Sequence, residues 1–260
     1  MGDWREIIVV DDGSEDATAD CAARAGATVV KHPYRKGNGA AIKTGIRKAS
    51  GEFVLIMDGD GQHAPEDAPR LIDRLGEFDL VVGCRTPSSH ASATRRLGNA
   101  FLSRLASYLT AHPIPDLTSG FRCARRERLL EFMHLLPNGF STPTTTTLAF
   151  VKVGYNVAFE PIRVQRSLGT SKVRLAHDGA RFCVILLRVV MLFSPMRIFA
   201  PVSGFAFVIG AGYGLMSVVA GHRIPNGALL LLLFSIMVFL IGLVSEQIST
   251  LWIRDGHDRQ

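Results

Sequence analysis

Hydrophobic and polar positions follow two different patterns along this chain of 260 residues. Over the first 165 residues, short apolar runs alternate with segments in which apolar residues recur at helical spacing. Strands that alternate with helices are typical of a mainly parallel sheet with helices on both faces, so we predict an α/β fold. The pattern predicts strands at 7–10, 27–31, 53–57 and 80–83, and helices at 15–26, 39–49 and 65–75.

Two long apolar runs dominate the C-terminal part. No residue from Phe199 to Gly221 carries a formal charge, and a second uncharged run continues to Val244 and Ser245. Each can cross a hydrocarbon layer of about 30 Å, whereas core helices of soluble proteins rarely run past about 18 residues without a charge. We therefore expect two transmembrane helices. Glu246, near the end of the second run, is expected to snorkel or cap a helix, and a functional intramembrane carboxylate stays open.

Basic residues flank the two apolar runs and predict their orientation. Because arginines before and after the runs outnumber the single arginine of the connecting turn, both ends are expected in the cytosol. Two of them are seven residues apart on one face of an otherwise apolar segment, which predicts an interfacial amphipathic helix. The flanking arginines are Arg181, Arg188 and Arg197 before the runs, and Arg254 and Arg259 after them.

Composition narrows the classes of partner. The chain is 47% hydrophobic with a mean hydropathy of +0.21, too apolar for a disordered segment. Its formal charge of +6 fits an anionic partner such as a phosphate or a lipid headgroup. Nucleic acid is disfavoured, because the basic residues gather beside the apolar runs rather than among aromatic residues. The four cysteines form no C-x-x-C pair, so they indicate neither a zinc site nor a disulfide framework.

Acidic motifs follow two of the predicted strands. Asp11 and Asp12 come after the first strand, and Asp58 and Asp60 come after the third. Ligands of such sheets gather at the carboxyl ends of the strands. Two carboxylates on one turn, with Gln62 as a neutral oxygen donor, suit a hard divalent cation held against a diphosphate. An Asp-Gly-Asp turn alone would be an ordinary turn, but its position at a strand end beside a second acidic pair favours a metal site.

Five motifs in order complete the pattern. They are VVDDGSEDAT, HPYRKGNGAA, MDGDGQHAPED, DLTSGFR at 116–122 and R-x-x-G-x-S-K at 166–172. Together they resemble family 2 glycosyltransferases, and more narrowly the polyisoprenyl-phosphate glycosyltransferases, the group that includes dolichol-phosphate mannose synthase. The resemblance covers nearly the whole chain. It implies a GT-A fold, a GDP- or UDP-linked sugar donor, a divalent metal (Mg²⁺ or Mn²⁺) and an inverting mechanism.

The resemblance also implies roles for individual residues. It assigns the donor to Asp11, Asp12, Lys36, Asn38 and Asp58, the metal to Asp58, Asp60 and Gln62, and catalysis to Asp58, Asp60 and Arg122. The acceptor phosphate is assigned to Arg85, Ser119, Arg122, Arg166, Ser171 and Lys172. Arginine agrees with this role, since its planar fork suits phosphate oxygens.

Other polar residues carry weaker predictions. The helix that opens at residues 36–39 either offers N–H groups to a phosphate or is a plain helix start. His32 and His63 are expected to be structural, and Asp116 is a base only if the acceptor is a sugar hydroxyl. The threonine-rich run 142–147 is interpreted as the start of a helix near the acceptor groove.

These predictions divide the chain into four parts. They are a GT-A-type catalytic domain (1–165), a basic loop with an interfacial helix (166–197), a two-helix transmembrane hairpin (198–253) and a cytosolic tail (254–260). Members of the group normally begin with an earlier strand that carries a Pro and an Asn-Glu pair. Since neither is present here, we expect the catalytic domain to be truncated at its N-terminus, without that strand and the helix after it.

The predicted function is sugar transfer from a nucleotide sugar to a polyprenyl (dolichyl or undecaprenyl) phosphate, by an integral protein of a prokaryotic plasma membrane. A phosphate monoester is already anionic at neutral pH and needs no general base. The alternatives are another membrane acceptor, either a glycolipid or a polysaccharide, and an inactive membrane scaffold. Metal-dependent nucleotide binding separates the enzyme from the scaffold. Self-association, the sugar and the nucleotide stay open.

Overall fold

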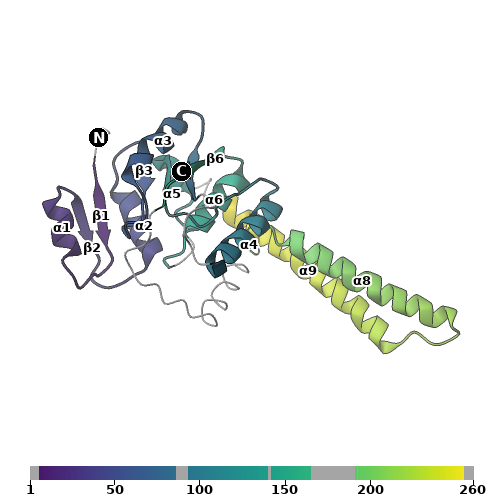
Figure 1. Cartoon of the computed structure of the whole chain (residues 1–260). Coiled ribbons are helices and arrows are strands. Elements are labelled where there is room, and N and C mark those ends of the chain that lie inside the picture. Colours follow the sequence, from purple (N-terminus) through teal and green to yellow (C-terminus); the bar gives the residue numbers. More distant parts are fainter. Residues whose placement is uncertain (1–5, 86–92, 140–141, 165–190, 192, 255–260) are drawn as a thin grey trace. The chain divides into compact units, whose positions relative to one another are not determined.

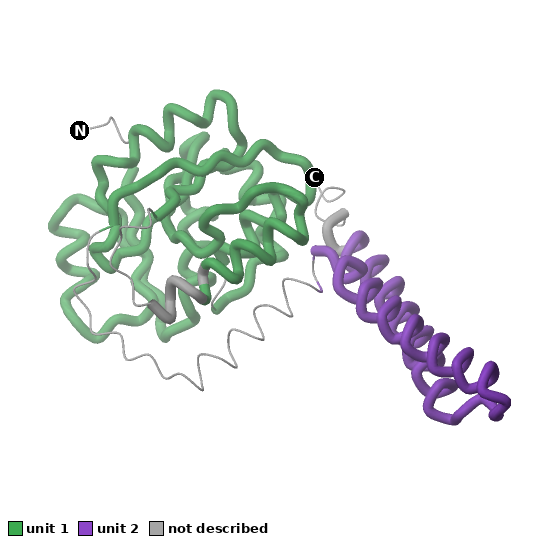
Figure 2. Tube along the Cα trace, turned by 45° about the vertical axis from the view of Figure 1, so that its right-hand side comes forward, with its two compact units in different colours: residues 1–179 green, residues 180–260 purple. Residues whose placement is uncertain are grey.

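The computed structural model describes residues 6–85, 93–139, 142–164, 191 and 193–254. The chain divides into two compact units, residues 1–179 and 180–260 (Figure 2). The expected interfacial helix with Arg181 and Arg188, and the basic loop with Arg166, Ser171 and Lys172, lie outside the described residues.

Strands and helices alternate through the first unit (Figure 1). The elements that the apolar pattern predicted before residue 85 are confirmed, with ends that differ by a few residues. The predicted helix 65–75 is the short helix α3 between two 3-10 turns, 65–67 and 74–76. The strands are β1 (Ile8–Asp11), β2 (Thr28–Lys31), β3 (Phe53–Ile56), β4 (Leu80–Arg85), β5 (Arg122–Arg125) and β6 (Val157–Ile162). The helices are α1 (Thr18–Arg24), α2 (Asn38–Lys48), α3 (Ala68–Asp73), α4 (Ala93–Thr110), α5 (Arg126–Glu131) and α6 (Thr142–Val153).

The strands form two sheets, and their directions differ from the expectation. β1 and β2 pair in parallel, and α1 and α2 pack against them. The other four strands have the order β3-β5-β4-β6, in which β5 runs antiparallel to both neighbours and β6 runs parallel to β4. The sheet is therefore mixed rather than mainly parallel. The difference arises because β5 inserts between β3 and β4. Its sequence, RCAR, lacks the β-branched run that marked the other strands, so the apolar pattern did not predict this strand.

A compact apolar cluster lies between α3 and the four-stranded sheet. Phe121, which directly precedes β5, is fully buried in it, so the DLTSGFR motif is fixed to the core at that point. A fully buried phenylalanine contributes roughly 1.5 to 3 kcal/mol of transfer free energy. The cluster consists of Ala68, Leu71, Leu75, Val81, Phe121, Cys123, Ala158 and Ile162.

The threonine-rich run is helical, as expected, and forms the start of α6. Its five threonines are all buried. Thr146 and Thr147 donate their hydroxyl groups to the carbonyl groups of Thr142 and Pro143, one turn earlier. These internal hydrogen bonds allow polar side chains to be buried without partners from solvent.

The second unit contains two long apolar helices, α8 (Met196–Val219) and α9 (Asn226–Arg254), which lie side by side as a hairpin (Figure 1). Two segments, Met196–Val219 and Asn226–Leu251, are long and apolar enough to cross a membrane, with mean hydropathies of 1.8 and 2.9. Most of their side chains are exposed, as lipid-facing residues would be.

Glu246 has the capping role that was one of its two expected roles. Its Oε2 accepts the backbone N–H of Met196, at the first position of α8, with an N···O distance of 3.2 Å. A carboxylate at a helix N-terminus stabilises the exposed N–H groups and the positive end of the helix dipole.

Candidate active site

Asp12 ties the loop before α2 to the end of β1. Its Oδ1 accepts the N–H of Lys36 at 2.9 Å, and its Oδ2 accepts the N–H of Gly37 at 2.7 Å. His32 Nδ1 hydrogen-bonds to Oδ1 at 2.7 Å, and His32 Nε2 lies 3.0 Å from Thr44 Oγ1. Burial raises the pKa of Asp12, but these hydrogen bonds outweigh it, so its pKa lies below the usual value. Both carboxylate oxygens are thus used within the protein, and His32 has the structural role expected for it.

Asp11, the other member of the pair, has an open oxygen. Its Oδ1 accepts the N–H of Ser14 at 2.8 Å, and hydrogen bonding to Ser14 lowers its pKa. The residue is only 2% exposed, and its Oδ2 has no hydrogen-bond partner among the described residues. A buried carboxylate oxygen without a donor is costly, which favours a ligand N–H or O–H at this point.

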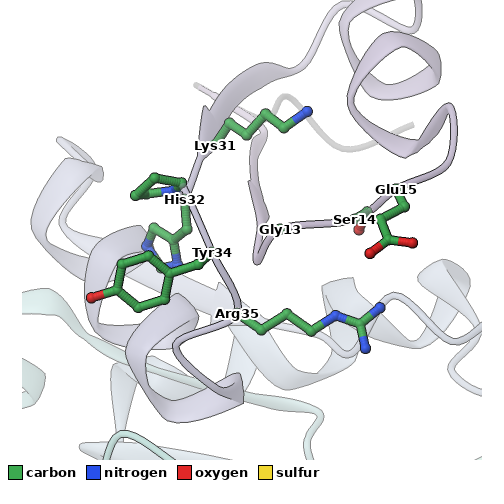
Figure 3. A pocket seen from close by; sticks show the side chains of 8 residues that line it. Gly13, Ser14, Glu15, Lys31, His32, Tyr34 and Arg35 are labelled. Carbon is green, nitrogen blue, oxygen red and sulfur yellow. The ribbon is translucent and has the colours of Figure 1, made fainter.

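A cavity of about 650 Å³ opens beside the loop that follows β1. Figure 3 shows Lys31 and Arg35 extending to the same side as Ser14 and Glu15, so two cationic groups border the opening. This charge suits an anionic ligand. The lining residues are Gly13, Ser14, Glu15, Lys31, His32, Pro33, Tyr34 and Arg35.

The start of α2 is covered by the loop at 137–139. Gly39 N–H donates to Gly139 O at 3.3 Å, and Ala40 N–H donates to Asn138 O at 2.9 Å. Gly37 has φ +104°, and a Cβ there would lie 2.6 Å from Asn138 O, so both its conformation and the close approach require glycine. Because the N–H groups of Gly39 and Ala40 already donate to these carbonyl groups, the start of α2 is a plain helix start rather than a phosphate site. The side chains of Lys36 and Asn38 are exposed, and Asn38 Nδ2 lies 3.5 Å from Asp58 Oδ1.

The residues predicted to hold the metal lie directly after β3. Asp60 Oδ1 accepts the N–H of Gln62 at 3.0 Å, which folds this segment into a tight turn. Asp58 is half-buried, Asp60 is exposed, and within the described part of the chain neither forms an ion pair. No group of three or more His, Cys, Asp or Glu residues suited to a metal occurs in this part. Two carboxylates that have no cationic partner among the described residues, together with an amide oxygen, fit a hard cation that takes its remaining ligands from water or a diphosphate.

The DLTSGFR segment lies against this turn. A Cβ on Gly120 would lie 2.6 Å from Asp58 Cγ and closer still to Oδ2, so a larger residue would displace this carboxylate. The next residue, Phe121, stacks on His63 with ring centroids 5.2 Å apart. Burial lowers the pKa of His63, and its Nδ1 has no hydrogen-bond partner in the described part of the chain. Sequence reasoning missed this role of Gly120, although the motif itself contains the residue.

Arg85 and Asp116 bind each other in a two-point ion pair. Arg85 Nε lies 2.7 Å from Asp116 Oδ2, and Nη2 lies 2.8 Å from Oδ1 and also donates to Thr118 Oγ1. Burial raises the pKa of Asp116, but hydrogen bonds and the charge of Arg85 together bring it below the usual value. Among the described residues these hydrogen bonds use Nε and Nη2 and leave Nη1 over, and the Arg85 side chain is 27% exposed. The Nη1 side of the Arg85 guanidinium is therefore available to bind the predicted phosphate.

Ser119 and Arg122, also predicted to receive a phosphate, lie in the interior. Ser119 is buried, and its Oγ accepts the N–H of Phe121 at 3.4 Å. Arg122 is 2% exposed and donates to the Ser119 carbonyl, to Pro143 O at 2.7 Å and to Thr147 Oγ1 at 3.2 Å. Burial lowers its pKa to about 10, so the guanidinium is still charged at neutral pH. The sequence placed the threonine-rich run near the acceptor groove, but it did not predict these contacts with Arg122, because nothing local links residues 119–122 to 143–147.

Comparison with known proteins relates both units to characterised families. A model described as glycosyl transferase family 2 matches residues 3–131, and one described as GtrB C-terminal hairpin matches residues 194–251. Two of the relatives come from Haloferax volcanii. Glycosyltransferase AglJ is 28% identical over 96% of this chain and 88% of that protein, and a dolichyl-phosphate hexose transferase is 30% identical over 68% and 78%. An undecaprenyl-phosphate 4-deoxy-4-formamido-L-arabinose transferase of Pectobacterium carotovorum is 26% identical over 86% and 68%.

A solved structure shares the arrangement of the first unit. Glucosyl-3-phosphoglycerate synthase of Mycobacterium tuberculosis, in complex with Mn²⁺ and UDP-glucose, gives a TM-score of 0.55 at 25% identity. The match covers 72% of this chain and 67% of the synthase.

Proposed function

Because the chain belongs to the family 2 glycosyltransferases, we propose that it transfers a sugar from a nucleotide sugar to the phosphate of a membrane polyprenyl phosphate. The GT-A fold expected from the sequence is confirmed, and the chain is a glycosyltransferase. The observation that carries the proposal is the pair of carboxylates without a described cationic partner, Asp58 and Asp60, after β3 in a chain with two apolar helices.

The donor would be held by its diphosphate and its nucleoside. Asp58, Asp60 and Gln62 would hold Mg²⁺ or Mn²⁺, which would offset the charge that develops on the leaving diphosphate. The Mn²⁺ and UDP-glucose of the related synthase support such a donor site. Asp11, with its open oxygen, would accept a hydrogen bond from the nucleoside, while Asp12 would act by holding the loop before α2.

Lys36 and Asn38 would complete the donor site. Both side chains are exposed, and Asn38 already approaches Asp58. Lys36, whose Nζ lies 5.5 Å from the centre of the Tyr34 ring, would bring a positive charge to the diphosphate.

The acceptor would supply the nucleophile. An oxygen of the polyprenyl phosphate attacks the anomeric carbon, the bond from that carbon to the nucleoside diphosphate breaks, and the configuration inverts. No proton has to be removed, since the phosphate is already anionic near neutral pH. Arg85 Nη1 would receive the phosphate, together with Arg166, Ser171 and Lys172. The relatives named for dolichyl and undecaprenyl phosphate support this acceptor class.

The C-terminal hairpin would keep the catalytic domain beside its lipid acceptor. In this proposal α8 and α9 span the membrane, and both chain ends lie in the cytosol, as the distribution of arginines predicts. A polyprenyl tail would then remain in the bilayer while its phosphate reaches the site.

The test is product formation in membranes that contain the chain. Membranes would be incubated with polyprenyl phosphate, Mg²⁺ or Mn²⁺ and a panel of UDP- and GDP-sugars, and lipids would be analysed by mass spectrometry. We expect one donor to give a polyprenyl-phosphate sugar, and Asp60→Ala to abolish it. No product with any donor would contradict the proposal, as would full turnover by Asp60→Ala at saturating metal. If the unaltered chain formed no product and also did not bind nucleotide in the presence of metal, the inactive-scaffold alternative would be supported.

A further inference from the structure

Arg122 is a buried cation without a carboxylate partner. It forms no ion pair among the described residues, and its hydrogen bonds go to two carbonyl groups and one hydroxyl. An unpaired buried charge costs several kcal/mol unless it is well hydrogen-bonded. The groups to which Arg122 donates its hydrogen bonds therefore indicate its role.

The groups bound by Arg122 belong to two separate segments. One is the Ser119 carbonyl, and the others are Pro143 O and Thr147 Oγ1 in the first turns of α6. The carbonyl of Ser119 is part of the peptide bond that joins Ser119 to Gly120. Arg122 therefore fixes that peptide group to a rigid helix.

The register of the sheet brings this peptide group to Asp58. In the antiparallel pair of β3 and β5, Ile56 is the partner of Arg122. Continuing that register by two residues places Gly120 opposite Asp58, and the absence of room for a Cβ on Gly120 confirms the close approach. The peptide group held by Arg122 thus forms the wall against which the Asp58 carboxylate rests.

From this geometry we propose that Arg122 is a positioning residue for the metal site. It acts through the Ser119–Gly120 peptide group on the carboxylate of Asp58, and it does not touch the acceptor phosphate. The proposal rests on the proposed function, because it takes Asp58 as a ligand of the cation that binds the donor diphosphate. It replaces the direct phosphate contact that the sequence suggested for Arg122.

The two roles differ in the step that they affect. A direct ligand of the acceptor would change the KM for polyprenyl phosphate and leave donor binding intact. A positioning residue for Asp58 would change metal-dependent nucleotide binding before any acceptor is present. Binding of UDP and of GDP to the purified full chain in detergent, with Mn²⁺ or with EDTA and without acceptor, separates them.

We expect Arg122→Met to weaken Mn²⁺-dependent nucleotide binding by at least about tenfold, or 1.4 kcal/mol. Arg122→Lys should fall between Arg122→Met and the unaltered chain, because one ammonium group lacks the planar fork that reaches all three acceptors. Binding in EDTA should not change. Arg125→Met is the matched control on the same strand, since Arg125 pairs with the exposed Glu52 at the surface, and it should bind like the unaltered chain.

Three results would overturn the proposal. The first is unchanged Mn²⁺-dependent binding by Arg122→Met with a raised KM for polyprenyl phosphate, which would restore the direct contact. The second is unchanged binding with only a lower melting temperature, which would indicate a merely structural role. The third is failure of the unaltered chain to bind either nucleotide with Mn²⁺, which would refute the proposed function and this role with it.

A milder variant keeps the proposal testable if Arg122→Met does not fold. Thr147→Val removes one of the three acceptors of Arg122 and keeps the shape of the side chain. It should weaken Mn²⁺-dependent binding in the same direction by a smaller factor. Binding equal to that of the unaltered chain would then count against the proposal.

Discussion

Gly120→Ala should disable the enzyme while leaving it folded. The added Cβ would lie 2.6 Å from Asp58 Cγ, whereas non-bonded carbon atoms approach to about 3.5 Å or more. The two groups must therefore separate by at least about 1 Å, since Asp58 Oδ2 would lie closer to the Cβ than Cγ does. Asp58 is half-buried, and the atoms that the Cβ would meet are the end of its side chain rather than backbone, so we expect this side chain to move rather than the core.

The displacement sets the size of the effect. A shift of about 1 Å in a group that positions a substrate can cost about 100-fold in rate, so we expect turnover to fall about 100-fold. Forcing one side chain off its rotamer costs about 0.5 to 1.5 kcal/mol, so the melting temperature should fall by only a few degrees.

The assay measures both quantities on the same preparation. Initial rates of polyprenyl-phosphate sugar formation and thermal melting in detergent would be compared for the unaltered chain, Gly120→Ala and Gly76→Ala. Gly76 is the matched control, because a Cβ there meets no atom within 4 Å. Turnover of Gly120→Ala within twofold of the unaltered chain would refute the reasoning, since the carboxylate would then not need its observed position.

Three further changes test other parts of the structure. Arg85→Met should lower the free energy of unfolding by about 3 kcal/mol at neutral pH, because Asp116 would be left as an unpaired buried charge. This loss should shrink as the pH falls, because burial without Arg85 raises the pKa of Asp116 and the carboxyl then takes up a proton. Asp12→Asn should lower the free energy of unfolding by about 1 to 3 kcal/mol, because one amide oxygen replaces two carboxylate acceptors, and it should speed trypsin cleavage of the loop before α2. Glu246→Ala should lower the free energy of unfolding by about 1 kcal/mol, and Glu246→Gln should lower it by less, since the amide oxygen still accepts the Met196 N–H.

Unfolding at several pH values, limited proteolysis and melting in detergent measure these effects. A pH-independent difference between Arg85→Met and the unaltered chain would contradict the ion-pair account. Unchanged trypsin cleavage of Asp12→Asn would show that Asp12 does not hold the loop. Equal melting temperatures for Glu246→Ala and Glu246→Gln would argue against the cap.

The sequence predicted the elements whose information is local. Apolar spacing located the strands and helices before residue 85 and the two apolar helices, because each buries a face set by its own residues. It did not predict β5, whose sequence RCAR is a strand only because β3 and β4 flank it. The mixed sheet therefore followed from tertiary pairing.

The candidate site divides in the same way. Asp58 and Asp60 were found from their place after a strand. Arginine is ordinarily exposed, so nothing in the sequence marked Arg122 as buried, and its partners on α6 are distant along the chain. Asp11 and Asp12 are adjacent and identical in type, so the sequence does not distinguish them. In the fold, the loop before α2 donates hydrogen bonds to both oxygens of Asp12, whereas Oδ2 of Asp11 has no described partner.

The most direct test of the account is the stoichiometry of the reaction by the purified chain. Nucleoside diphosphate release and glycolipid formation would be measured together, with and without polyprenyl phosphate, in Mg²⁺, Mn²⁺ or EDTA. The account predicts one nucleoside diphosphate for each polyprenyl-phosphate sugar, only when both the acceptor and a divalent metal are present. Release that is independent of polyprenyl phosphate, or glycolipid formation that persists in EDTA, would contradict it.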